Sequence, residues 1–421
     1  MIHFLQNLKN KIFLRDGHFI LLAQLVEKVI NFIIMIIAAR YMNVTAYGHF
    51  SYVKSIIATL TPFAGFGGNH ALLRFGMDSN ELKEKYLLLC SSLFFGSIFT
   101  IMLIFMLYLL FEVPSEAENI FSIYIFFILF YYLFVTIQNF YRIIKDNRSY
   151  AIHSIKYSFS ILIFGTLSLV LFNEIIFVLT ITLLPLFYIL ISNFFQLKQQ
   201  IKIEIKFNKE YWKYGLTIGL GAFLNQFFLQ ADILVLGYLE VAPTLIAQYK
   251  VSTLVIYLFL FIPNSFLVRD FTLISENAKN STFLISYAFA YMQYASLVLV
   301  FLIPIFYFLS TSLFSLLFGT DYVNKDNVQN ILIFAIIGFV LLRMPFANIL
   351  NAVGYAKFNV YNAVITILLA LFFLIVGTKK YGIEGTAYAM VLVSFISGFL
   401  SLAMFWYYIY LLKKNNEEVK L

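Results

Sequence analysis

Long apolar stretches follow one another along almost the whole chain, and short polar segments separate them. Each stretch is about 20 residues long, the length that an α-helix needs to cross the hydrocarbon core of a bilayer. The apolar positions are continuous, without the alternation of apolar and polar residues that marks the strands of a membrane β-barrel. The pattern therefore predicts an all-α membrane protein. We expect about 12 transmembrane helices, over residues 18–39, 46–69, 86–111, 120–141, 151–172, 175–196, 214–239, 244–268, 284–310, 328–350, 358–377 and 385–411.

The predicted helices fall into two equal sets, separated by a connection that is rich in Lys and Gln. We expect an N-terminal six-helix lobe over residues 1–196, a cytoplasmic linker over 197–211 and a C-terminal six-helix lobe over 212–421. A set of six helices begins and ends on the same side of the membrane. The two lobes are therefore expected to be parallel repeats around a central cleft, related by an axis along the membrane normal.

Weak internal similarity supports this duplication. The segment AYGHFSYVKS (46–55) opens the second predicted helix, and LIAQYKVSTL (245–254) opens the eighth. Their alignment places Lys250 opposite Ser51, which shares a helix face with Lys54 three residues further on. We therefore expect Lys54 and Lys250 to project from equivalent faces of the two lobes into the cleft.

The basic residues of the loops set the orientation of the helices, because cytoplasmic loops carry an excess of Lys and Arg. Most of them lie in the loops that share a side with both termini and with the central linker. The opposite loops hold only Arg40, Lys325, Lys379 and Lys380. Both termini are therefore predicted to be cytoplasmic.

Composition agrees with a lipid environment and narrows the chemistry. Hydrophobic residues make up 62% of the 421 residues and charged residues 12%, against about 25% charged residues in typical soluble domains. We attribute the net charge of +8 to membrane orientation and expect no nucleic acid as a partner. A single cysteine, Cys90, excludes a disulfide framework, and the five histidines show no metal-ligand spacing. No metal and no cofactor are expected.

Several basic residues fall inside predicted spans, where a charge at the helix centre costs about 2.5–3.5 kcal/mol or more. Lys28 lies at mid-membrane depth, Lys54 and Lys250 lie deeper than simple solvation allows, and Arg343 is nearer the inner surface. Lining a cavity, with Arg40 at its outer mouth, these residues would suit an anion such as a pyrophosphate. Two alternatives stay open: each Lys pairs with a local carboxylate, or Arg343 extends to the interface.

Two carboxylates, Glu27 and Asp232, also fall inside predicted spans. Glu27 directly precedes Lys28 and is interpreted as its structural partner, although either carboxylate is also a candidate to carry a coupling ion. Asp232 follows a stripe of amide side chains that either faces the cleft or bonds neighbouring helices. Further upstream, Gly215 and Gly219 have the spacing of a GxxxG motif, which predicts close helix packing.

Five short segments occur in order along both halves of the chain: AARYMNVTAYGHFSYV (38–53), ADILVLGYL (231–239), LFGTDYV (317–323), LNAVGYAKF (350–358) and YGIEGTAYA (381–389). They resemble sequence elements of the polysaccharide-exporter branch of the multidrug/oligosaccharidyl-lipid/polysaccharide flippase superfamily, the Wzx type. Those elements are A-R-x-L-G…Y-G…F, D-x-x-x-L-G, L-F-G-x-x-Y, L-x-A-x-G-x-x-K and G-I-x-G-A-A. The resemblance covers nearly the whole chain.

This resemblance implies a flippase of the bacterial inner membrane. Such proteins move undecaprenyl-diphosphate-linked oligosaccharide repeat units from the cytoplasmic to the periplasmic leaflet by alternating access, for O-antigen or capsular polysaccharide biosynthesis. The implied partners are this lipid-linked oligosaccharide, membrane lipids, H⁺ or Na⁺ as a coupling ion, and the polymerase of the same pathway. The related lipid II flippases use cationic residues on helices that include the first, second and eighth. Lys28, Lys54 and Lys250 lie on those helices here.

Two other functions compete with this interpretation. A multidrug or cation exporter of the same superfamily would need acidic residues in its cavity, whereas the charges inside the predicted spans are mainly basic. A membrane enzyme, such as a polysaccharide polymerase or ligase, would be expected to carry a sizeable outer loop with Arg or His. The longest outer loop predicted here covers only residues 311–327. The sequence therefore favours a transporter over an enzyme.

Overall fold

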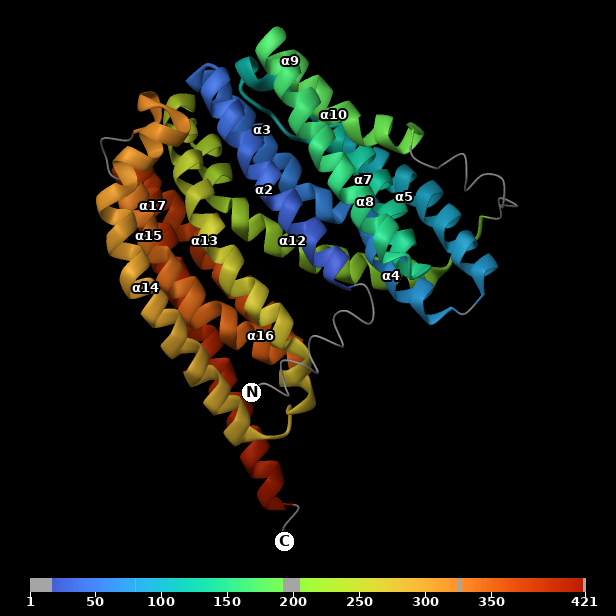
Figure 1. Ribbon diagram of the computed structural model, residues 1–421, viewed down its shortest axis with the longest axis vertical. Helices are drawn as coiled ribbons and strands as arrows, with labels where there is room; N and C mark the ends of the chain where they lie inside the picture. The colour runs from blue at the N-terminus through green and yellow to red at the C-terminus, as the bar shows by residue number, and fades with distance from the viewer. Residues whose placement is uncertain (1–16, 80, 192–204, 324–327, 419–421) are drawn as a thin grey trace. The chain divides into compact units, whose positions relative to one another are not determined.

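The computed structural model describes residues 17–79, 81–191, 205–323 and 328–418. Within these ranges every regular element is a helix, so the predicted all-α class is confirmed. Most of the predicted linker, residues 197–211, lies outside the described residues. Figure 1 shows the elements in chain order, from blue at α2 to red at α17.

The first six predicted spans all correspond to helices of the structure, and three of them are interrupted. The second span breaks between α3 and α4, the fourth between α6 and α7, and the fifth passes through a π-helical turn, η3. The elements are α2 (Gly17–Tyr41), α3 (Val44–Leu60), η1 (Thr61–Gly67), α4 (Gly68–Asp78), α5 (Leu82–Leu110), η2 (Ser115–Ala117), α6 (Glu118–Tyr124), α7 (Phe127–Ile143), α8 (Asn147–Ser160), η3 (Ile161–Gly165), α9 (Thr166–Leu171) and α10 (Glu174–Ile191).

The remaining six predicted spans also correspond to helices. The eleventh and twelfth form one element, α17, which bends at Tyr381 and Gly382, where the backbone leaves the helical region. Eight helices of the described residues are long and apolar enough to cross a membrane, and one of these contains both of those spans. The elements are α12 (Lys209–Tyr238), α13 (Pro243–Glu276), α14 (Ser281–Phe318), η4 (Thr320–Tyr322), α15 (Val328–Ile337), η5 (Gly338–Arg343), α16 (Met344–Ala352) and α17 (Ala356–Glu418).

The break in the second span is built from glycine. Gly65, Phe66 and Gly67 all have positive φ values, a conformation that only glycine adopts without steric cost. Gly67 lies directly against the backbone of Gly215, and a Cβ on Gly67 would collide with the Gly215 carbonyl. Gly219 packs on the same segment. The close packing predicted from the GxxxG spacing is therefore confirmed, with the broken helix as its partner.

Contacts divide the chain into two compact units, which we call unit 1 (up to Gln226) and unit 2 (from Phe227). The division falls inside α12, so this helix begins in unit 1 and ends in unit 2. In unit 1, α2 packs against α8, and α7 packs against α10. In unit 2, α15 and α16 pack against α17. The lobe boundary at residues 196–212 stays a prediction.

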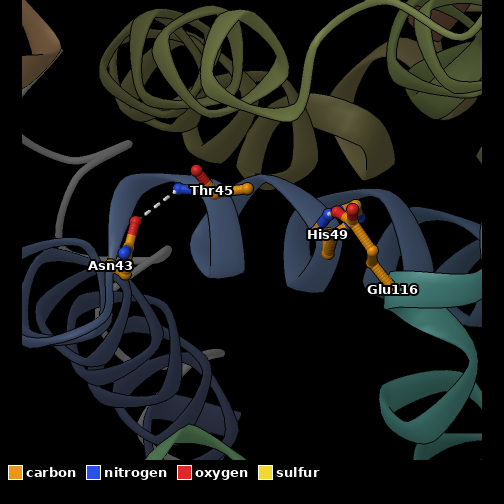
Figure 2. Close-up of polar contacts among 4 residues, drawn as sticks. All are labelled: Asn43, Thr45, His49 and Glu116. Carbon is orange, nitrogen blue, oxygen red and sulfur yellow. Dashed lines mark hydrogen bonds and ion pairs between the residues drawn. The ribbon is translucent and has the colours of Figure 1, made fainter.

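A matching contact at the start of α3 and of α13 supports the internal duplication. In unit 1, His49 Nε2 lies 3.0 Å from Glu116 Oε2, in the turn η2 that follows α5 (Figure 2). In unit 2, Gln248 Nε2 donates to the carbonyl oxygen of Asp321 at 3.0 Å, in the turn η4 that follows α14. The alignment that places Lys250 opposite Ser51 also places Gln248 opposite His49. Equivalent residues thus bind equivalent turns in the two units.

Candidate functional site: charges inside the membrane spans

Lys54 lies on α3 in unit 1, and two of its contacts are with neutral groups. Its Nζ donates to the thioether sulfur of Met35, on α2, at 2.9 Å. The same ammonium lies 5.7 Å from the centre of the Phe50 ring, where a cation is attracted by the ring face. The side chain is half-buried. Both of these contacts tolerate the positive charge without neutralising it.

Lys28 belongs to the same side of α2 as Met35. The two residues are seven apart, which is about two helical turns or roughly 10 Å along the axis. Lys28 is exposed, and so are Gln24 and Asn31, which precede and follow it by about one turn. A polar stripe therefore leads along α2 toward the Met35 and Lys54 contact. Lys28 therefore lies on the side of α2 that Lys54, from α3, contacts through Met35.

Glu27 has a different neighbour from the one predicted. The Ser154 hydroxyl, on α8, lies 3.5 Å from the Glu27 carboxylate and accepts a hydrogen bond from the Gln138 amide at 2.9 Å. Ser154 and Gln138 are both buried. The charges of Glu27 and Lys28 do attract each other. The pairing with Lys28 thus remains a prediction, and the structure adds a buried polar chain from α2 through α8 to α7.

Unit 2 brings Lys250 and Asp232 together on adjacent helices. Lys250, on α13, is 8% exposed and donates to the Gln230 side-chain carbonyl at 3.1 Å. Asp232, on α12, is 1% exposed, and its charge and that of Lys250 attract each other. Gln230 is one of the amide side chains that precede Asp232 on α12, so these amides reach a buried cation. A cation and a carboxylate this deeply buried are each costly alone, and their proximity offsets part of that cost.

Arg343 ends the π-helical turn η5, in the same unit. Its guanidinium lies 4.3 Å from the centre of the Phe228 ring and 5.9 Å from that of Phe339. Phe228 is one turn before Asp232 on α12. Arg343 and Lys250 therefore both lie against the same short stretch of α12. A π-helical turn is rare and occurs frequently at functional sites.

Arg40 lies apart from these contacts, in the last turn of α2, and its side chain is exposed. The short turn after it is fixed by Asn43, whose side-chain oxygen accepts a hydrogen bond from the Thr45 backbone N–H at 3.0 Å (Figure 2). This bond caps the start of α3. Arg40 thus lies where α2 meets α3, at the end predicted to face outward.

Several neighbours of the charged residues were not identified from the sequence. Met35 and Ser154 carry no charge, and nothing in an apolar helix singles them out. Gln24 and Asn31 did leave a signal, since their spacing around Lys28 is that of one helix face. Among the described residues there is no cluster of three or more His, Cys, Asp or Glu side chains that could hold a metal ion.

The charges assembled in each unit are unequal. Lys28, Lys54 and Arg40 in unit 1 accompany one carboxylate, Glu27. Lys250 and Arg343 in unit 2 accompany one carboxylate, Asp232. Both units therefore carry an excess of positive charge at these positions. In a medium of low dielectric constant, such an excess favours anions over cations.

Solved structures of similar fold are transporters and a flippase. An inward-facing multidrug resistance MATE family transporter of the MOP superfamily is 12% identical, with a TM-score of 0.72, over 92% of this chain and 96% of that one. The lipid II flippase MurJ is 17% identical, with a TM-score of 0.67, over 91% and 86%. A MOP superfamily transporter from Pyrococcus furiosus is 13% identical, with a TM-score of 0.64, over 96% of both chains. A reversed polarity of the binding pocket is described for that transporter.

Sequence comparison supplies the family. No curated protein matches the chain in sequence. The family model described as polysaccharide biosynthesis protein matches residues 13–250, more than half of the chain. Together with the fold, this match confirms the predicted superfamily. The chain is a multi-pass membrane protein that belongs to the polysaccharide biosynthesis protein family.

Proposed function

We propose that this protein is a flippase for undecaprenyl-diphosphate-linked oligosaccharide repeat units. It moves them from the cytoplasmic to the periplasmic leaflet of the bacterial inner membrane by alternating access, for O-antigen or capsular polysaccharide biosynthesis. Both termini lie in the cytoplasm. The observation that carries this proposal is the excess of basic side chains at membrane depth in both units of a polysaccharide biosynthesis protein.

A diphosphate explains why those basic residues persist. Each Lys or Arg inside a span costs about 2.5–3.5 kcal/mol or more on insertion scales. Lys54 is held by a thioether and a ring, and Arg343 by aromatic rings. A multiply charged anion would stabilise such cations further, through the short charge-assisted hydrogen bonds that phosphate oxygens form with ammonium and guanidinium groups.

The basic residues take different parts in this proposal. Lys28, Lys54 and Lys250 contact the diphosphate. Arg343 contributes a further positive group in unit 2, and Arg40 attracts the anion at the outer end of α2. The polyprenyl chain stays in lipid, and the sugars need only polar surface. The protein makes and breaks no covalent bond in this cycle.

The two carboxylates are the candidates for energy coupling. Glu27 lies at the end of a buried chain through Ser154 and Gln138, a geometry that suits a site loaded from one side of the membrane. Asp232 is buried beside Lys250. H⁺ or Na⁺ is the proposed coupling ion. The polymerase of the same pathway is the proposed partner that receives the product.

The test replaces Lys54 and Lys250 together by Gln in cells that depend on this protein for surface polysaccharide. Glutamine keeps a polar side chain of similar length and removes the charge. We expect normal amounts of protein in the membrane and a loss of at least about tenfold in polysaccharide, because charge–phosphate contacts of this kind are worth more than about 1.4 kcal/mol.

The matched control is Lys279→Gln, at an exposed position between α13 and α14. It removes the same charge outside the spans and should leave export unchanged. Full export by the Lys54→Gln/Lys250→Gln double variant contradicts the proposal. So does a loss of export that is matched by loss of the protein itself.

A further inference from the structure

Asp232 is almost fully enclosed and only partly bonded. It is 1% exposed. One carboxylate oxygen, Oδ1, accepts a hydrogen bond from the backbone N–H of Ile233 at 2.8 Å. The other oxygen, Oδ2, has no hydrogen bond of good geometry among the described residues, and the Tyr249 hydroxyl, on α13, lies near enough to stabilise the carboxylate. A buried carboxylate with an idle oxygen is costly, so its position calls for a nearby positive charge.

Lys250 supplies that charge from the next helix. It is 8% exposed, and its charge attracts that of Asp232. Its Nζ also donates to the neutral Gln230 side chain, two residues before Asp232. This amide orients the ammonium and carries no charge of its own, so Asp232 supplies the negative charge that attracts Lys250.

The negative charge that balances Lys250 is therefore Asp232, a group of the protein itself. An external anion that binds Lys250 must take over the attraction that Asp232 provides. When the anion is bound, Asp232 stays buried but must share the Lys250 ammonium with it, and this raises the free energy of the bound state. When the anion leaves, Lys250 and Asp232 attract each other fully again.

We propose that Asp232 is a built-in competitor that displaces the substrate's diphosphate from Lys250. This inference rests on the proposed function and adds a device to it: Asp232 limits the affinity of unit 2 for the anion and speeds its release. A flippase needs such a limit, because a site that holds its substrate too tightly does not let it go on the far side.

The contrast with unit 1 supports this assignment. There Lys54 donates to a thioether and lies over a ring, and both groups are neutral. Ser51, which the repeat aligns with Lys250, carries a hydroxyl and no charge. These two contacts of Lys54 contain no carboxylate, whereas Lys250 in unit 2 has Asp232 beside it.

The experiment measures binding of farnesyl diphosphate, a short prenyl diphosphate, to the full-length protein in detergent by isothermal titration calorimetry. Lys250→Gln should bind the probe about tenfold more weakly than wild type, as expected for one lost charge contact. Asp232→Asn should bind it about tenfold more tightly. The double variant should bind like Lys250→Gln alone, since Asp232 acts only through Lys250.

Controls separate this effect from damage to the fold. Asp270→Asn removes a different carboxylate, on α13, that accepts a hydrogen bond from the Tyr287 hydroxyl, and should leave the affinity unchanged. Asp232→Glu keeps the charge and should stay within about twofold of wild type. If Asp232→Asn does not fold, as shown by its size-exclusion profile, Asp232→Ser removes the same charge and replaces it in the comparison.

The outcomes distinguish the two proposals. Wild type that does not bind farnesyl diphosphate overturns the proposed function and this inference together. Weaker binding by Lys250→Gln without tighter binding by Asp232→Asn overturns the inference and leaves the function standing. Tighter binding by Asp232→Asn that persists in the Lys250→Gln background also overturns it, because the effect would then bypass Lys250.

Discussion

At the scale of single residues, two basic side chains inside predicted spans contact soft neutral groups. Lys54 has a thioether sulfur at 2.9 Å and an aromatic ring beneath it, and Arg343 lies over Phe228. Such contacts compensate some of the desolvation of a cation and add no negative charge. They are compatible with the anion binding that we propose at these positions.

The charge of Lys54, rather than its shape, should matter for export. Lys54→Arg keeps the charge and should retain more surface polysaccharide than Lys54→Gln, which removes it. A loss of about threefold is expected for Arg, because its head group has a different shape, and of tenfold or more for Gln, because the charge contact is lost. Polysaccharide and membrane protein are measured together for each variant. Equal export by the two variants would show that the charge is not used.

At the scale of elements, the broken second span is fixed by glycine contacts that leave no room for a side chain. Gly67 has a φ of 70° and lies against Gly215, while Gly219 packs on the same turn. A second close contact also depends on glycine. Tyr132 packs against Gly65 and Gly96, and its hydroxyl donates to the Ser92 carbonyl at 2.9 Å. The break is thus closely packed within unit 1.

Gly67→Ala should therefore destabilise the protein markedly. The new Cβ would meet the Gly215 carbonyl, and the backbone would keep a left-handed conformation that costs alanine about 1–2 kcal/mol. Together with the collision, a loss of about 2–4 kcal/mol is expected. The matched control is Gly221→Ala on α12, where nothing lies within 4 Å of the added methyl group.

Thermal unfolding in detergent gives the comparison. Gly67→Ala should lower the unfolding midpoint by several degrees, whereas Gly221→Ala should leave it unchanged or raise it, because alanine is the better helix former. If both variants unfold like wild type, the contact between η1 and α12 is looser than described.

The contacts at the starts of α3 and α13 give a second element-scale prediction. Because Gln248 performs in unit 2 what His49 performs in unit 1, His49→Gln should preserve the bond to the turn η2. His49→Ala should lose it, at a cost of about 1 kcal/mol. Hydrogen exchange at residues 115–117 should therefore be faster, by about fivefold, in the Ala variant only. Faster exchange in both variants would mean that glutamine cannot replace histidine here.

At the scale of the whole molecule, the chain divides into two units that share one long helix. α12 contacts the broken second span through Gly215 and Gly219 and later carries Gln230 and Asp232. The division inside this helix is a property of its contacts, because no change in hydropathy marks Gln226. The fold extends over 91–96% of the chain in the transporter and flippase structures compared.

Orientation is the prediction that belongs to this scale. The excess of Lys and Arg in one set of loops places residue 205 and the C-terminus in the cytoplasm. Fusions at both positions to a reporter active only in the cytoplasm, and to one active only in the periplasm, give the measurement. Cytoplasmic signals are expected at both. A periplasmic signal at either would require an odd number of spans before it.

The sequence by itself determined the elements and their number. An apolar run of about 20 residues matches the thickness of a bilayer, and the length of such a run is a local property of the chain. All twelve predicted spans therefore correspond to helices, and the GxxxG spacing correctly indicated close packing. The depth of Lys28, Lys54 and Lys250 stays a prediction, made from the count of residues along each helix.

Only the tertiary structure decided which groups meet those charges. Ser154 contacts Glu27 from a helix more than a hundred residues away in the sequence. Among the amides of α12, Gln230 is the one that accepts a hydrogen bond from Lys250, because α13 places Lys250 beside it. Apolar spans carry almost no pattern that specifies their neighbours, because lipid-facing and helix-facing positions are both apolar. Packing between helices decides three features that no local pattern encodes. They are the partners of the charges, the glycine-built break and the π-helical turn that ends at Arg343.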